Sequence, residues 1–143
     1  MKRLWSLFMI ILLLTFLSAC SDSPDTPIEP NENNMMINIK NNANFDFYGL
    51  ETKILNHSQG MTNADGSIIE NGEELRFEFL KEDFELDGEV EMETFILADG
   101  NVEDDVDRIQ LNKKVTLELV NNKELFFEIT GDSINEADLK RIK

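Results

Sequence analysis

The fold is decided by the stretch Leu75-Arg76-Phe77-Glu78-Phe79, in which apolar and charged residues alternate. A period of two places successive side chains on opposite faces of a β-strand, so one face is buried and the other is wet. The same alternation recurs in residues 90–94, 115–119 and 125–129. The last two segments flank the turn residues Asn121-Asn122, and this predicts that they form a hairpin.

About seven such segments occur between residues 35 and 143, separated by short turns. This spacing favours a mainly β fold, an antiparallel β-sandwich of two sheets. In strand number and turn spacing the domain resembles immunoglobulin-like and fibronectin-like modules. The Cys–Trp–Cys pattern of true immunoglobulin domains is absent, and a likeness of fold carries no function.

The C-terminal residues 133–143 change period. Ser133 and Glu136 have the spacing of a helix capping box, and Leu139 and Ile142, three apart, would share one face of a helix. The basic residues of this segment lie toward its end, where a helix dipole favours cations. We therefore predict a short C-terminal helix that closes one end of the sandwich.

The charge balance narrows the class of partner. The 143 residues include 29 Asp or Glu against 13 Lys or Arg, which gives a formal net charge of −16. Nucleic-acid binding depends on basic patches that neutralise phosphates, so this charge argues against it. It also argues against direct adhesion to anionic lipid headgroups.

The N-terminus has the pattern of an export signal. Lys2 and Arg3 precede an apolar run from Leu4 to Leu17. Fourteen residues of helix span about 21 Å, which is less than the ~30 Å hydrocarbon core of a bilayer. The run is therefore typical of a signal-peptide core and not of a permanent transmembrane helix.

The run ends in Leu17-Ser18-Ala19-Cys20, with two small residues before the only cysteine of the chain. This sequence resembles the lipobox of bacterial lipoproteins. The resemblance implies that residues 1–19 are a removed signal peptide and that Cys20 carries a diacylglyceryl group. It also implies a lipid-anchored protein on the extracytoplasmic face of the cell membrane. A single cysteine allows no disulfide within the chain.

Residues 20–34 read as a tether. They contain all three prolines of the chain and are acidic and poor in apolar residues. This composition is typical of a disordered, semi-extended linker. We therefore expect a lipidated Cys20 and linker over residues 20–34 and an acidic β domain over residues 35–143.

Catalytic residues are not evident. The only histidine, His57, lies beside Ser58 in a polar segment that reads as a loop. Adjacent residues seldom reach the geometry of a nucleophile and its base, and no orienting acid is marked. One histidine and a lipidated cysteine cannot build a tetrahedral zinc site. We therefore predict no enzyme activity.

The acidic loop 99–107 is the best candidate for a metal site. Asp99, Asn101, Glu103, Asp105 and Asp107 offer alternating oxygen ligands of the kind that Ca²⁺ prefers. The loop departs from an EF-hand because its sixth position is Asp104 and its twelfth is Gln110. A solvated loop between strands is the other interpretation.

Two hypotheses of function follow from the sequence. The first is a membrane-anchored, non-catalytic binding module whose partner is an envelope protein or a cell-wall component. The second is a cation-binding domain that uses the loop 99–107 and Ca²⁺. No other cofactor and no nucleic acid is expected in either case.

Overall fold

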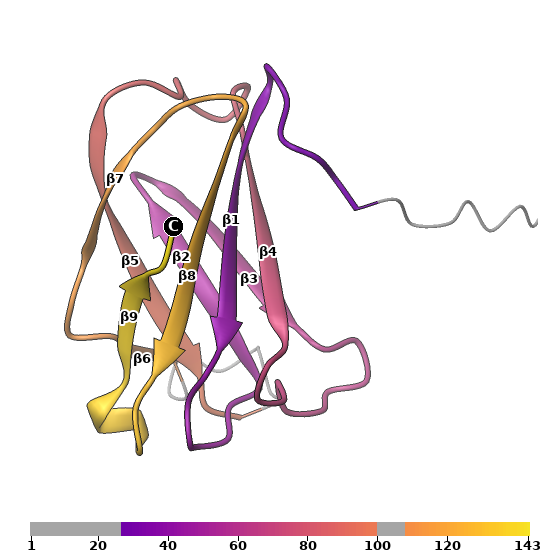
Figure 1. The fold of residues 1–143 in the computed structure, drawn as a ribbon, viewed down its shortest axis with the longest axis vertical. Helices are drawn as coiled ribbons and strands as arrows, with labels where there is room; N and C mark the ends of the chain where they lie inside the picture. Colours follow the sequence, from indigo (N-terminus) through magenta and orange to yellow (C-terminus); the bar gives the residue numbers. More distant parts are fainter. Residues whose placement is uncertain (1–26, 100–107) are drawn as a thin grey trace, which may run out of the picture.

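The computed structural model describes residues 27–99 and 108–143. Within them nine strands form two sheets that are arranged like a β-sandwich (Figure 1). Sheet A has the order β4 (Glu74–Leu80), β1 (Asn34–Asn41), β8 (Lys123–Thr130) and β9 (Asp138–Arg141). Sheet B has the order β3 (His57–Thr62), β2 (Gly49–Ile54) and β5 (Glu89–Leu97), with β6 (Arg108–Gln110) and β7 (Val115–Glu118) both paired to β5. The predicted mainly β, two-sheet fold is confirmed.

The core lies between the two sheets and follows the period-two pattern. Phe77 and Phe79 of β4 are fully buried, as are Ile37 and Ile39 of β1 and Phe127 of β8. Each fully buried side chain of this size contributes about 1.5–3 kcal/mol by removal from water. The alternation seen in the sequence therefore sets which face of each strand packs inward.

The predicted all-antiparallel pairing is wrong at one place. β1 and β8 are parallel, with Ile37 opposite Leu125, whereas the other strand pairs are antiparallel. The predicted hairpin of residues 115–119 and 125–129 is also wrong, because β7 pairs with β5 in sheet B and β8 belongs to sheet A. The Asn121-Asn122 turn carries the chain from one sheet to the other, and Asn122 adopts a φ of +55° there.

The predicted C-terminal helix is also wrong. Only Ile134–Glu136 form a single 3-10 turn, and the chain then continues as β9, antiparallel to β8. Ser133 hydrogen-bonds the Glu136 side chain at 3.3 Å but makes no side-chain cap bond to the backbone. An isolated helix this short is marginal in water. Strand pairing instead satisfies the edge of β8 and buries Leu139 opposite Ile129.

No helix among the described residues has the length and apolar character needed to cross a membrane.

Candidate functional site

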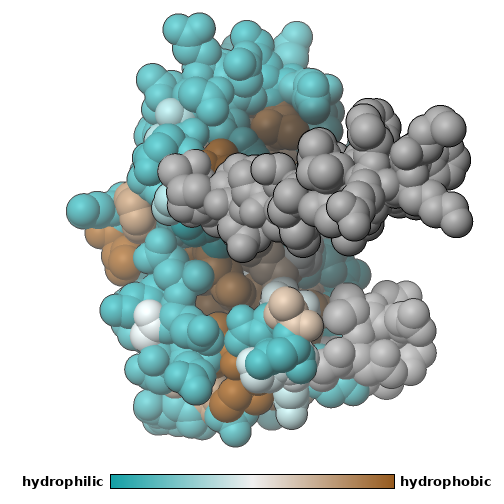
Figure 2. Space-filling model, turned by 90° about the vertical axis from the view of Figure 1, so that its right-hand side faces the viewer, coloured by the Kyte–Doolittle hydropathy of each residue, from teal (hydrophilic) through white to brown (hydrophobic). Residues whose placement is uncertain are grey.

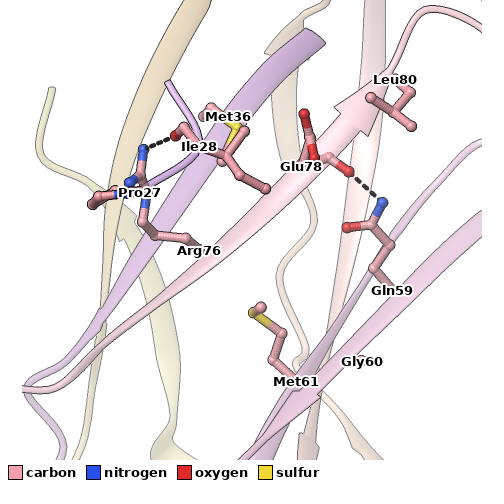
Figure 3. Close-up of a pocket in the computed structure, with 9 residues that line it drawn as sticks. All are labelled: Pro27, Ile28, Met36, Gln59, Gly60, Met61, Arg76, Glu78 and Leu80. Atoms are coloured by element: carbon pink, nitrogen blue, oxygen red, sulfur yellow. Dashed lines mark hydrogen bonds between the residues drawn. The ribbon is translucent and has the colours of Figure 1, made fainter. Parts of the chain in front are cut away.

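A recess with mostly apolar walls lies where the edge strands of the two sheets meet. β3 ends sheet B and β4 ends sheet A, and a groove of about 630 Å³ separates them. Its apolar lining comes from Met61 of β3, Leu80 of β4, Met36 of β1, and Pro27 and Ile28 (Figure 3). The face that includes these strands shows hydrophobic atoms in a hollow among hydrophilic side chains (Figure 2). We call this recess the β3–β4 groove.

One wall of the groove is the free edge of β4. The backbone bonds Asn41 N to Glu73 O and Lys81 N to Asn33 O fix the register of β4 on β1. Because antiparallel ladders alternate, the N–H and C=O groups of Arg76, Glu78 and Leu80 then point away from β1. Among the described residues, two groups bond this edge. The Gln59 side chain donates to the Glu78 carbonyl, and the Asp83 N–H donates to the Leu80 carbonyl at 3.1 Å.

The other wall is the inward face of β3. His57, Gln59 and Met61 alternate along it and project toward β4. The His57 ring packs against Phe79 and Phe84 with centroid distances of 6.3 and 5.9 Å, and its Nε2 lies 3.5 Å from Asp83. The inward face of β3 therefore covers the core at the side where the edge strands β3 and β4 are not joined by backbone hydrogen bonds.

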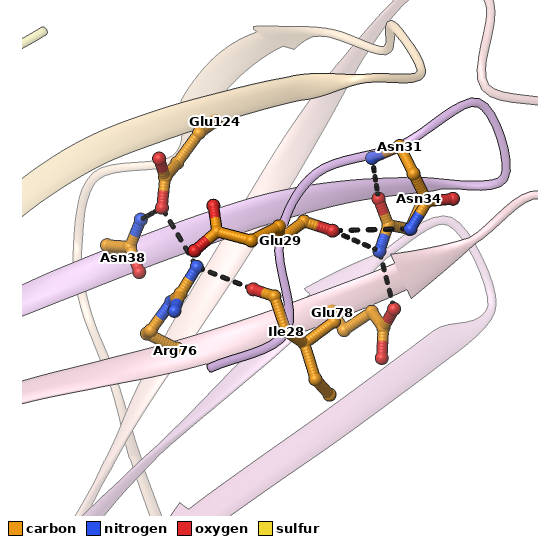
Figure 4. A network of polar contacts seen from close by, with 8 residues as sticks. All are labelled: Ile28, Glu29, Asn31, Asn34, Asn38, Arg76, Glu78 and Glu124. Atoms are coloured by element: carbon orange, nitrogen blue, oxygen red, sulfur yellow. Dashed lines mark hydrogen bonds and ion pairs between the residues drawn. The ribbon is translucent and has the colours of Figure 1, made fainter. Parts of the chain in front are cut away.

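An N-terminal strap, residues 27–33, crosses the outer face of sheet A (Figure 4). Arg76 donates to the Ile28 carbonyl at 2.8 Å and pairs with Glu124 at 3.1 Å. Asn34, at the start of β1, donates to the Glu78 carboxylate at 2.6 Å. Ile28 remains 54% exposed, while Met36 beneath the strap is 2% exposed. Pro27 and Ile28, which the sequence places in the expected linker, line the groove.

The structure separates the two residues considered as a catalytic pair. His57 and Ser58 are successive residues of β3, not of a loop, so their side chains project to opposite faces. The Ser58 hydroxyl donates to Glu51 at 2.6 Å, and Glu51 also accepts two bonds from Arg108 at 2.5 and 2.6 Å. The Arg108 guanidinium in turn stacks 3.7 Å from the centre of the Phe95 ring.

The acidic loop can be followed only at its start. Asp99 follows β5, whereas Asn101, Glu103, Asp105 and Asp107 lie outside the described residues. Within residues 27–99 and 108–143, no group of three or more His, Cys, Asp or Glu is arranged to hold a metal ion. Calcium binding by the loop stays a prediction. Calorimetry tests it, and the binding isotherm should disappear in Asp105→Ala. Cys20 likewise lies outside the described residues.

A second charged cluster lies on the outer face of sheet B. Lys114 is 2.8 Å from Glu93 and 3.5 Å from Glu91. The hydrogen bond from Lys114 lowers the pKa of Glu93, and the same bond raises the pKa of Lys114. Lys114 and Glu91 are exposed and Glu93 is half-buried, so the cluster is a partly solvated salt bridge of modest strength.

Comparisons with known proteins assign no family. The chain matches no protein-family model, and searches of curated proteins and of solved structures find no match.

Sequence reasoning did not find the groove. Gln59 and Met61 belong to a polar segment, His57–Thr62, that lacks the alternation of the other strands. The sequence cue that could have indicated the groove is Met61, the apolar residue of this polar segment. In the structure its side chain is 38% exposed. The groove also depends on which strands form sheet edges, and this is a property of tertiary pairing.

Proposed function

We propose that the chain is a lipoprotein on the extracytoplasmic face of the cell membrane, tethered through Cys20. Its β domain serves as a non-catalytic module that binds an envelope protein in the β3–β4 groove. The observation that carries the binding role is an apolar groove of about 630 Å³ beside an open strand edge. Grooves of this volume that combine apolar walls with a few polar groups are typical of binding sites.

The tether supports an envelope protein close to the membrane as the partner. Seven residue steps separate Cys20 from Pro27, which lines the groove. A fully extended chain of this length reaches about 25 Å. A lipid on Cys20 therefore keeps the groove within this distance of the membrane surface, out of reach of distant cell-wall layers.

The two-layer arrangement supports the immunoglobulin-like or fibronectin-like class as the finer description of the domain. Sheets of four and five strands with inward-facing alternate residues fit this class. The class hosts many unrelated functions, so the binding role rests on the groove.

Two experiments test the proposal. Metabolic labelling with a fatty acid should label the wild-type chain and not Cys20→Ala. A Cys20→Ala chain that still fractionates with membranes as a processed species would contradict the anchor.

For the binding role, a photo-crosslinking amino acid replaces Met61 in cells. The matched control carries it at Ile142, which is 50% exposed at the opposite edge of sheet A. One envelope protein should be crosslinked from position 61 in proportion to the chain and not from position 142. Equal yields from the two positions would refute the groove as the binding site.

A further inference from the structure

We propose that the β3–β4 groove binds an extended peptide segment that bears Lys or Arg side chains and adds as a strand to the free edge of β4. This inference rests on the proposed binding function and specifies its partner. An exposed sheet edge binds an extended peptide through main-chain hydrogen bonds, and side-chain pockets supply the specificity.

The edge of β4 offers the main-chain groups. The N–H groups of Arg76, Glu78 and Leu80 point into the groove, and no described residue accepts a backbone hydrogen bond from them. The Gln59 side-chain amide donates a hydrogen bond to the Glu78 carbonyl. In a complex with an added strand, a backbone N–H of that strand would take the place of this amide. Binding therefore exchanges one side-chain bond for a ladder of backbone bonds.

The walls of the groove offer contacts for alternate side chains. An added strand projects its side chains to two sides, with a period of two. Those on one side meet Met61 of β3, and those on the other meet Ile28 and Leu80. Burial of apolar side chains there adds affinity beyond that of the backbone bonds.

Charge selects a cationic segment over a second copy of the chain. β4 and its flanking turns, residues 70–83, carry six acidic and two basic residues. The acidic residues are Glu70, Glu73, Glu74, Glu78, Glu82 and Asp83. Pairing two copies of this edge brings like charges together, and charged edge strands oppose such pairing. A strand with Lys or Arg side chains meets complementary charge instead.

The test uses the full-length chain, isotope-labelled in detergent micelles, and two capped peptides. One peptide alternates lysine with valine and the other alternates glutamate with valine. The lysine peptide should bind saturably and slow the hydrogen exchange of the Arg76, Glu78 and Leu80 amides. Added salt should weaken its binding, because the interacting charges are exposed. The glutamate peptide should leave the same amides unchanged.

Two variants of one position separate the backbone from the side chain. Glu78→Ala and Glu78→Pro both lose the carboxylate, but only Glu78→Pro loses the outward N–H. We expect Glu78→Pro to weaken the lysine peptide at least about tenfold more than Glu78→Ala does. Arg141→Pro is the matched control on β9, the other edge of sheet A. The Ile142 N–H donates to the Phe126 carbonyl, so the Arg141 N–H points away from β8, where proline is tolerated. Arg141→Pro should bind the peptide as the wild type does.

Three results would overturn the inference. These are equal binding by Glu78→Pro and Glu78→Ala, peptide-induced protection that maps away from β4, and self-association of the chain through β4. A partner crosslinked from position 61 in the absence of lysine-peptide binding would refute the strand-addition mode and leave the proposed function standing. The absence of both would refute both.

Discussion

Leu55 occupies a backbone conformation that suits glycine. It lies between β2 and β3 with a φ of +54° and a 53% exposed side chain. The left-handed region costs a residue with a Cβ about 1–2 kcal/mol, and an exposed leucine recovers little of this by burial. Leu55→Gly should therefore stabilise the fold by about 1 kcal/mol.

The measurement for Leu55 is the urea midpoint of unfolding at unchanged slope. Asn122→Gly is the control, because Asn122 has nearly the same φ, +55°, and asparagine tolerates this region. The gain at position 122 should be smaller than at position 55. A lower midpoint for Leu55→Gly would show that the side chain makes a stabilising contact.

The Glu93–Lys114 pair gives a prediction about titration. Lys114 lowers the pKa of Glu93 through a hydrogen bond, so this contribution to stability is present above the ordinary pKa of a glutamate. It is lost as the pH falls through the lowered pKa of the folded state. Lys114→Met should raise the pKa of Glu93 toward its ordinary value, as followed by carboxyl NMR. The pKa of Asp65, which the Ser67 hydroxyl lowers, should stay unchanged.

At the scale of the element, the C-terminal strand is open to a direct test. Leu139 and Ile142 would share a face of a helix, but on a strand residues three apart face opposite sides. Leu139 is 1% exposed and Ile142 is 50% exposed. Leu139→Ala should cost about 2–4 kcal/mol of unfolding free energy, and Ile142→Ala should change it by less than about 0.5 kcal/mol. Similar losses at both positions in chemical denaturation would favour the helix.

The sequence predicts elements well where one face of a strand is buried and the other is wet. This pattern correctly predicts β4, β5 and β8. β3 was missed because an edge strand over an open side of the sandwich can be polar on both faces. β9 was missed because the Ser133 and Glu136 spacing favours a local cap, while burial of Leu139 on β8 decides the outcome.

Strand partners were harder to predict than strands. The Asn121-Asn122 turn is compatible both with a hairpin and with a crossing between sheets, because its backbone geometry is local. The groove could not be predicted for the same reason, because it depends on which strands lie side by side. Gln59 and Glu78 are 19 residues apart and meet only because β3 and β4 end different sheets.

At the scale of the whole molecule, the net charge affects stability through the sum of many weak repulsions and not through any single contact. A formal charge of −16 on 143 residues repels itself most strongly in the compact state. Counterions screen this repulsion, with a Debye length of about 10 Å at 0.1 M and about 3 Å at 1 M salt. Sodium chloride should therefore raise the urea midpoint over this range.

The same repulsion predicts how charge variants respond to salt. Glu82 and Glu89 are exposed and enter no described salt bridge. Replacing both with glutamine should raise the midpoint at low salt and flatten its dependence on sodium chloride. The two-residue control, Lys40 and Lys81 to glutamine, makes the net charge more negative and should steepen the dependence. A midpoint that falls with salt would mean that attractive pairs, such as Arg108 with Glu51 and Lys114 with Glu93, outweigh the repulsion.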